Sequence, residues 1–201
     1  MDVIVSVAID NEVVWYKNDG AQNFTENLID DSMDAPLNFV VIDLDEDGDK
    51  DVIVAAKNDD DVIWLSNDGS ENFTKNTIDN NLKSARDVVV IDLDEDGDLD
   101  ILATSDNSSG NEVVWYSNDG SENFTTNSIE SSLNSANILQ VGDIDGDNDL
   151  DVVVTSYQDD DLLWYSNDGS ENFTKNFIDN DIDVVSSTHL TLPTILLVST
   201  S

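Results

Sequence analysis

The sequence predicts an all-β fold: a β-propeller segment built from four-stranded antiparallel blades, with about three and a half blades in 201 residues. Three observations predict this fold. A unit of about 50 residues recurs, each unit holds four short apolar runs rich in β-branched residues, and no segment shows a helical period of useful length. A four-stranded unit of this length is the size of one propeller blade, and it must stack on neighbours to bury both faces.

A tryptophan marks the repeat, with spacings of 49, 51 and 49 residues between successive copies. Asn-Asp-Gly, Asn-Phe-Thr and an isoleucine follow it each time. The tryptophans are Trp15, Trp64, Trp115 and Trp164. Because large aromatic side chains are mostly core residues, we expect the tryptophan and the phenylalanine of each unit to fill the space between blades. Stacking on a ligand is the alternative role.

The unit that begins near residue 87 illustrates the expected strands, which cover residues 88–91, 101–104, 113–116 and 124–129. Asn-Asp-Gly between the third and fourth strands predicts a tight turn in which glycine or asparagine takes a positive φ. The repeats are predicted over residues 1–183, with a partial blade at 1–36. The full blades are predicted at 37–86, 87–137 and 138–183.

The two ends of the sequence depart from the repeat. Met1 and Asp2 align with Lys50 and Asp51, so the first unit lacks its first strand and most of the loop that follows it. Residues 184–201 form an atypical tail without acidic residues, which is expected to be foreign sequence or a substitute strand. This tail holds His189, the only histidine, so a histidine-based catalytic triad or zinc site elsewhere is excluded.

Three aspartate-rich loops lie between the first and second strands of the full units. They read DLDEDGDKD at 43–51, DLDEDGDLD at 92–100 and DIDGDNDLD at 143–151. Each carries a carboxylate at positions 1, 3, 5, 7 and 9, and these charges repel one another unless a cation lies among them. Calcium takes six to eight oxygen ligands, whereas the octahedral geometry of magnesium suits fewer carboxylates. The loops therefore predict about three Ca²⁺ sites.

The loop sequence also restricts the kind of calcium site. Position 6 is expected to adopt a positive φ, which suits Gly48 and Gly97 and is tolerated by Asn148 in the third loop. An EF-hand needs a glutamate at position 12, but that position holds Val54, Ala103 or Val154 in the three copies. An EF-hand is therefore excluded.

The motif DxDxDGxxD followed by an apolar strand, in units of about 50 residues, resembles the FG-GAP/VCBS repeats of integrin-alpha-like calcium-binding β-propellers. The resemblance implies that the side chains at positions 1, 3, 5 and 9 and the carbonyl at position 7 bind one calcium ion per loop. Glu46 and Glu95, at position 4, are expected to point to solvent, and Asp2 is not expected to bind alone. The implied ligands are Asp43, Asp45, Asp47, Asp49 and Asp51; Asp92, Asp94, Asp96, Asp98 and Asp100; and Asp143, Asp145, Asp147, Asp149 and Asp151.

Composition restricts the partners. With 7 basic and 45 acidic residues the formal charge is −38, which argues against nucleic acid and anionic membranes as partners. No cysteine is present, so disulfides and thiolate metal sites are excluded. No apolar run is long enough for membrane insertion. The expected partners are a protein or glycan ligand and the neighbouring repeats, and the expected location is extracellular or the cell surface.

The predicted function is a non-catalytic, calcium-binding propeller module of a secreted or cell-surface protein, serving adhesion or ligand or glycan binding. The alternative is the propeller portion of a carbohydrate-active enzyme such as a polysaccharide lyase. A catalytic residue should break the repeat, and the visible breaks are Arg86, the insertion at 106–110 and Gln140. Acidic residues at 59–61 and 159–161 are expected on the opposite face from the loops, as a solvated rim or as a site for a cationic partner.

Overall fold

A computed structural model describes residues 1–107 and 112–181, and these residues form antiparallel β-strands without a helix. The predicted tail at 184–201, His189 and part of the insertion at 106–110 lie outside the described residues. The strands are β1 (Val3–Val7), β2 (Glu12–Asn18), β3 (Phe24–Asp30), β4 (Pro36–Ile42), β5 (Asp51–Ala56), β6 (Asp61–Asn67), β7 (Phe73–Asp79), β8 (Ala85–Ile91), β9 (Asp100–Ser105), β10 (Val113–Asn118), β11 (Phe124–Glu130), β12 (Ala136–Gly142), β13 (Asp151–Ser156), β14 (Asp161–Asn167) and β15 (Phe173–Asp179).

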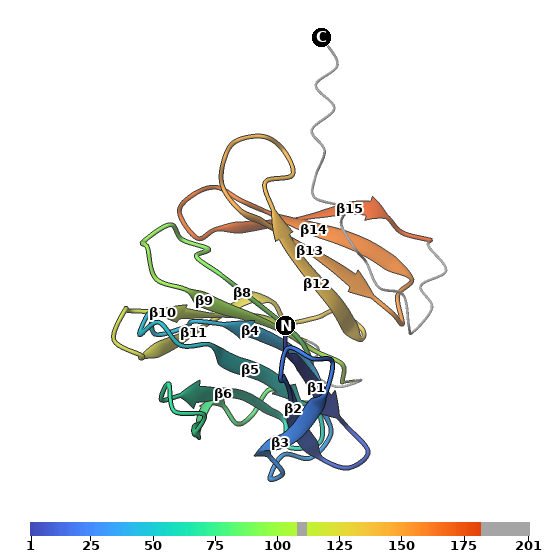
Figure 1. The fold of residues 1–201 in the computed structure, drawn as a ribbon. Helices are drawn as coiled ribbons and strands as arrows, with labels where there is room; N and C mark the ends of the chain where they lie inside the picture. Colours follow the sequence, from blue (N-terminus) through green and yellow to red (C-terminus); the bar gives the residue numbers. More distant parts are fainter. Residues whose placement is uncertain (108–111, 182–201) are drawn as a thin grey trace.

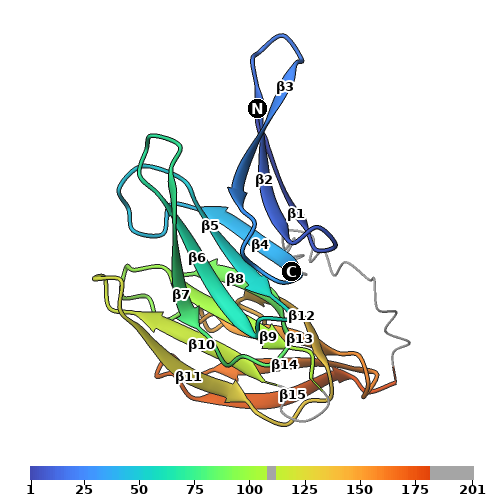
Figure 2. The same cartoon turned by 90° about the horizontal axis from the view of Figure 1, so that it is seen from below.

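The strands form four sheets, each with its strands in sequence order. Blade 1 has three strands, β1 to β3. Blades 2, 3 and 4 each have four, namely β4 to β7, β8 to β11 and β12 to β15. The sheets stack as a fan that does not close into a ring (Figures 1 and 2). The all-β fold of four-stranded, propeller-like blades is therefore confirmed, and the missing strand of the first unit is confirmed as well.

The first strands of blades 2, 3 and 4 converge on the inner side of the fan. β8 contacts both β4 and β12, although each lies in a separate sheet. The last strands, β7, β11 and β15, form the outer edges of their sheets and carry the exposed side chains. Because neighbouring strands within a blade are joined in order, every loop after a first strand lies at the same end of the fan.

Each blade is apolar on both faces, because successive side chains of a strand point to opposite sides. All six residues of β5, β9 and β13 are buried. In β5, Val52 and Val54 pack in a cluster with Val13 of blade 1, whereas Ile53 packs in a cluster with Val88 of blade 3. We call the side toward the preceding blade the front face and the side toward the following blade the rear face.

The repeated aromatic residues fill the interfaces, as predicted. Trp64 and Trp115 are buried on the rear faces of blades 2 and 3, where they pack with residues of the next blade. Phe124 and Phe173, on the front faces of blades 3 and 4, pack against the same two clusters. The interface between blades 2 and 3 and the one between blades 3 and 4 thus each receive a tryptophan from one blade and a phenylalanine from the next.

A hydroxyl-to-carboxylate bond links consecutive blades near the outer strands. Tyr116 Oη of blade 3 donates to Asp79 Oδ2 of blade 2 over 2.8 Å, and Tyr165 Oη of blade 4 donates to Glu130 Oε2 of blade 3 over 3.1 Å. Lys175 Nζ lies 3.0 Å from the same Glu130 oxygen. Burial alone would raise the pKa of Glu130, but hydrogen bonds from Ser132 and Lys175 outweigh it and lower the pKa to about 2.

We expect Glu130→Gln to lower stability in a pH-dependent way. A carboxylate whose pKa is depressed in the folded state stabilises the fold above its unfolded pKa, and this contribution is lost as pH falls toward the folded pKa. The free energy of unfolding should fall by about 1–2 kcal/mol at pH 7, because Lys175 is partly solvated. The difference between variant and wild type should shrink between pH 4.5 and pH 2.

Urea unfolding at several pH values measures this difference. Glu122→Gln, on an exposed side chain, is the matched control and should change stability by less than about 0.5 kcal/mol throughout. A Glu130→Gln difference that stays constant from pH 7 to pH 3 would contradict the expected role of the carboxylate.

Candidate metal sites

Each acidic loop connects the first and second strands of its blade, so the three loops lie at one end of the fan. The first loop follows β4 and ends where β5 begins at Asp51. In the first two loops the carboxylates at positions 1, 3 and 5 converge, with ligand oxygens within 4.8 Å of one another. In the third loop the converging residues are those at positions 1, 3 and 9. The three groups are Asp43, Asp45 and Asp47; Asp92, Asp94 and Asp96; and Asp143, Asp145 and Asp151.

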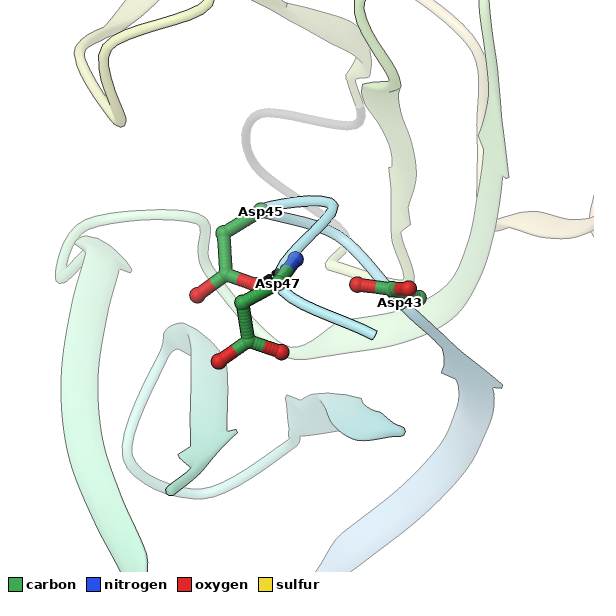
Figure 3. A group of neighbouring side chains, drawn as sticks. All are labelled: Asp43, Asp45 and Asp47. Carbon is green, nitrogen blue, oxygen red and sulfur yellow. Dashed lines mark hydrogen bonds between the residues drawn. The ribbon is translucent and has the colours of Figure 1, made fainter. Parts of the chain in front are cut away.

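Hydrogen bonds from the loop backbone hold these carboxylates in place. In the first loop Asp43 Oδ2 accepts from Gly48 N over 3.1 Å, and Asp45 Oδ1 accepts from Asp47 N over 3.3 Å. Asp47 Oδ1 accepts from Asp49 N over 2.9 Å. One oxygen of each carboxylate accepts a hydrogen bond from the loop backbone, and the other oxygen is available to a ligand. Figure 3 shows Asp45 and Asp47 side by side, with Asp43 across from them at the end of β4.

Two of the remaining oxygens are buried without a donor. Asp43 Oδ1 and Asp92 Oδ1 are out of contact with solvent, and no group of the described residues donates a hydrogen bond to them. A buried carboxylate oxygen without a partner is costly, and a cation would satisfy it. In the third loop the corresponding oxygen, Asp143 Oδ1, accepts from Gly146 N over 2.7 Å. The first and second loops therefore fit a cation most directly.

The loop backbone takes a left-handed conformation twice. Position 6 has a positive φ, as predicted: 100° at Gly48 and 81° at Asn148. Position 4 also has a positive φ, of 59° at Glu46 and 85° at Gly146, which the glutamate of the first two loops does not indicate. The third loop adopts the same two left-handed positions with other residues, glycine at position 4 and asparagine at position 6.

The position-7 side chain leaves the carboxylate cluster and covers a glycine. A Cβ built on Gly120, in the Asn-Asp-Gly segment between the third and fourth strands, would lie 2.5 Å from Asp98 Oδ2. Asp49 and Asp149 cover Gly69 and Gly169 in the same way. The position-7 side chain is therefore engaged with its own blade, while ligation through its carbonyl remains a prediction.

The position-9 aspartate is a buried link between two loops. Asp51 Oδ2 accepts from Leu44 N over 3.1 Å, and its Oδ1 accepts from Asn67 N over 2.8 Å. Asp100 repeats both bonds in blade 3. Burial raises the pKa of Asp100 to about 6, although the backbone hydrogen bonds from Asn118 and Leu93 oppose the shift. In the first two loops position 9 lies outside the converging group, and its predicted role as a ligand remains a prediction.

Asp2 occupies the position-9 place in blade 1. Asp2 Oδ1 accepts from Asn18 N over 3.1 Å, as Asp51 does from Asn67, and Asp2 Oδ2 accepts from Trp15 Nε1 over 3.2 Å. Asp2 therefore binds the start of the loop between the third and fourth strands of its blade, as Asp51 does in blade 2. The sequence could have indicated these two partners of position 9. A tryptophan and an asparagine recur in every unit together with the position-9 aspartate.

The Asn-Asp-Gly segment lies between the third and fourth strands, as predicted, but the connection is a loop of five residues. In blade 2 the third strand ends at Asn67 and the fourth begins at Phe73. Asp68 Oδ1 accepts from Ser70 N over 2.8 Å, and Asp68 Oδ2 accepts from Asn72 Nδ2 over 2.9 Å. Gly69 takes a positive φ, as predicted for glycine or asparagine, and Glu71, two positions later, takes one as well.

The acidic residues at the opposite end of the fan also bond to the backbone. Asp59 Oδ2 accepts from Asp34 N over 2.7 Å, and Asp60 Oδ1 accepts from Ser84 N over 2.8 Å. Asp159 Oδ2 accepts from Asn134 N over 3.0 Å. These carboxylates tie the hairpins between second and third strands to the segments that join the blades.

Two of the residues that break the repeat pair with each other. Arg86 Nη1 lies 2.9 Å from Asp106 Oδ2, and Arg86 also contacts Asn137 of blade 4. Beside it, the buried Asp87 accepts from Leu139 N of blade 4 over 2.8 Å and contacts Asn38 of blade 2. This polar group connects three blades at the start of their inner strands.

A comparison with protein families places these loops in context. The FG-GAP-like repeat family matches residues 43–103 and 92–154, and each match begins at the first aspartate of an acidic loop. Together the matches span more than half of the chain. The chain belongs to the FG-GAP-like repeat family. Among curated proteins, no sequence matches the chain.

Within this FG-GAP-like chain, the glycine under the position-7 aspartate offers a test of the loop geometry. Gly120→Ala should destabilise the protein by about 1–2 kcal/mol more than Gly20→Ala. Both residues have a positive φ, of 71° and 82°, so both substitutions carry the cost of a left-handed alanine. Only at Gly120 would the new Cβ meet a carboxylate, because nothing lies within 4 Å of that position at Gly20.

Chemical unfolding of the two variants measures the difference. The double variant Gly120→Ala with Asp98→Ala should recover the excess loss, since it removes the carboxylate from the new methyl group. Equal losses at Gly120 and Gly20 would show that Asp98 does not lie over the glycine in solution.

Proposed function

We propose that this chain is a calcium-binding β-propeller module of a secreted or cell-surface protein, with one Ca²⁺ in each acidic loop. The observation that carries the proposal is the pair of buried oxygens, Asp43 Oδ1 and Asp92 Oδ1, which have no donor beside converging carboxylates. Hard oxygen ligands on alternate residues of a tight loop are the donor set that calcium prefers. The side chains at positions 1, 3 and 5 would hold the ion in the first two loops, and those at positions 1, 3 and 9 in the third.

The module is proposed to be non-catalytic and to serve adhesion or the binding of a protein or glycan ligand. The fixed arrangement of the blades supports this role, because a rigid scaffold presents its loops in constant positions. The ion pair of Arg86 with Asp106 supports a non-catalytic role too. A catalytic residue is expected to break the repeat, and these two repeat-breaking residues bond to each other. The described residues contain no helix that could span a membrane. An extracellular or cell-surface location is part of the proposal.

Calcium should raise the thermal midpoint of the purified chain, and a chelator should lower it. At about 100 times the dissociation constant, each ion would contribute roughly 2.7 kcal/mol. Calorimetric titration should give about three ions per chain. A midpoint that does not respond to calcium or chelator would remove the basis of the proposal.

Asp43→Asn and Glu46→Gln form a matched pair within the first loop. Each removes one negative charge, but only Asp43 has the buried oxygen without a donor. Asp43→Asn should reduce the stoichiometry from about three ions to about two, and Glu46→Gln should leave it unchanged. An equal effect of both variants would indicate general charge attraction in place of a site.

The ligand class needs a separate measurement. A glycan array probed in calcium, followed by a turnover assay on any polysaccharide that binds, separates a binding module from part of a polysaccharide lyase. We expect binding without turnover. Cleavage of a bound polysaccharide by the purified chain would favour the enzymatic alternative.

A further inference from the structure

A small cavity lies between blades 3 and 4, beside the second acidic loop. Its volume is about 90 Å³, enough for several water molecules. Both blades that enclose it are four-stranded sheets, so the cavity belongs to an internal interface of the fan. Four of its lining residues carry a carboxylate, namely Asp94 and Glu95 of blade 3 and Asp149 and Glu171 of blade 4. Negative charges of two blades thus meet at one interface, which is unfavourable unless a cation lies near them.

Asp94 connects the cavity to the candidate metal site of the second loop. It lines the cavity, and its carboxylate converges with those of Asp92 and Asp96. Asp94 Oδ1 accepts from Asp96 N over 3.3 Å, and Asp92 Oδ1 is buried without a donor among the described residues. Calcium takes six to eight oxygens, more than three carboxylates supply with one oxygen each. Oxygens in the cavity can therefore complete the surroundings of an ion in this loop.

Glu171 is the carboxylate that the next blade brings to this cavity. It lies in the loop between β14 and β15 and is exposed. Burial raises the pKa of Asp94, and the charges of nearby carboxylates, Glu171 among them, add to the rise, so the two side chains are close. Among the described residues, no basic side chain pairs with either of them or with Glu95. A cation in the second loop would replace this repulsion by attraction.

The equivalent glutamate of blade 2 already pairs with a cation of the preceding blade. Glu71 forms an ion pair with Lys17 Nζ of blade 1. Glu71 and Glu171 both lie two residues after the glycine of their Asn-Asp-Gly segment, and both have a positive φ, of 69° and 61°. Blade 3 has Ser117 at the place of Lys17, two residues after the tryptophan. Glu171 thus occupies a position that binds a cation at another interface, but without the lysine.

A buried hydrogen-bond donor also lines the cavity. Trp115 is 2% exposed, and its side chain is part of the cavity wall. Its Nε1 lies near Asp100 but has no acceptor in hydrogen-bond geometry among the described residues, whereas Trp15 Nε1 donates to Asp2 over 3.2 Å in blade 1. A buried N–H without an acceptor is costly, and the oxygen of a water in the cavity would satisfy it. The cavity thus combines carboxylates with a donor, which suits the waters around a cation.

We propose that Glu171 binds the Ca²⁺ of the second loop, directly or through a water of the cavity, so that one ion bridges blades 3 and 4. This role of Glu171 rests on the proposed function, because it needs an ion in that loop. Glu171 lies outside the motif at 92–100, so the loop sequence alone does not indicate it. Calcium then stabilises the interface between the two blades as well as the loop.

Calorimetric titration of the full chain with CaCl₂ tests this role. Glu171→Gln should weaken one of the sites about tenfold, the size of effect expected for a group that supports a metal from outside its main ligands, and leave the other sites unchanged. Glu71→Gln is the matched control. It removes the same charge from the same place of the repeat, but Glu71 faces Lys17, so it should leave every site unchanged.

Thermal unfolding gives a second readout, in which the sign of the effect depends on calcium. Without calcium, Glu171→Gln should raise the thermal midpoint slightly, because it removes the repulsion with Asp94. With calcium the same variant should lower the midpoint, because the ion binds less tightly. Glu71→Gln loses its ion pair with Lys17 in both conditions, so its shift should keep the same sign. A purely structural role of Glu171 would not produce a change of sign.

The Asp92→Asn variant assigns the effect to the second loop. This substitution should remove one site, and Glu171→Gln added to it should leave the remaining affinities unchanged. Circular dichroism should confirm that the single and double variants are folded.

The outcomes separate this role of Glu171 from the proposed function. A wild type that binds no calcium overturns both. A wild type that binds about three ions, but in which Glu171→Gln and Glu71→Gln behave alike, overturns only the role of Glu171. An effect of Glu171→Gln that persists beside Asp92→Asn shows general charge attraction and overturns that role as well.

Discussion

The burial of apolar side chains between neighbouring blades is the constraint on which the rest of the structure depends. A sheet whose middle strand is buried at all six positions cannot be stable alone, because either free face would leave apolar side chains in water. Stacking covers these faces, with a tryptophan from one blade and a phenylalanine from the next between blades 2 and 3 and between blades 3 and 4. The acidic loops and the inner polar group take their positions from this stacking.

In the first two blades with an acidic loop, the loop is attached to that stack through positions 2 and 9, which lie outside the converging carboxylates. Leu44, at position 2, is 3% exposed and lies in the cluster between blades 2 and 3. Its amide donates to Asp51, whose other oxygen holds the loop between the third and fourth strands. Leu93 and Asp100 repeat this arrangement one blade later. An ion that orders positions 1, 3 and 5 would therefore also order the edge of an inter-blade interface.

The sequence predicted the blades and the carboxylate clusters, but not the backbone conformation at loop position 4 or the polar contacts between blades. The 50-residue period fixed the blades, and alternate aspartates predicted the convergence of Asp43, Asp45 and Asp47. The positive φ at Glu46 gave no signal, because glutamate is not a residue type that marks a left-handed position. The contacts of Asp87 with Asn38 and with Leu139 N could not be read from the repeat either. Asp87 aligns with an asparagine in one unit and an isoleucine in another, so only the stacking of three blades brings these groups together.

The carboxylates of this acidic chain include two kinds, which differ in whether their surroundings lower or raise the pKa. Asp68 represents the first kind. It is exposed, and the hydrogen bond from the Asn72 side chain, together with backbone bonds, lowers its pKa. Such a group is stable as an anion without a cation. Asp94 represents the second kind, because burial and the neighbouring aspartates raise its pKa despite a backbone hydrogen bond from Asp96. Since oxygens without a donor lie only beside carboxylates of the first two acidic loops among the described residues, a cation would stabilise these loops more than the other acidic turns.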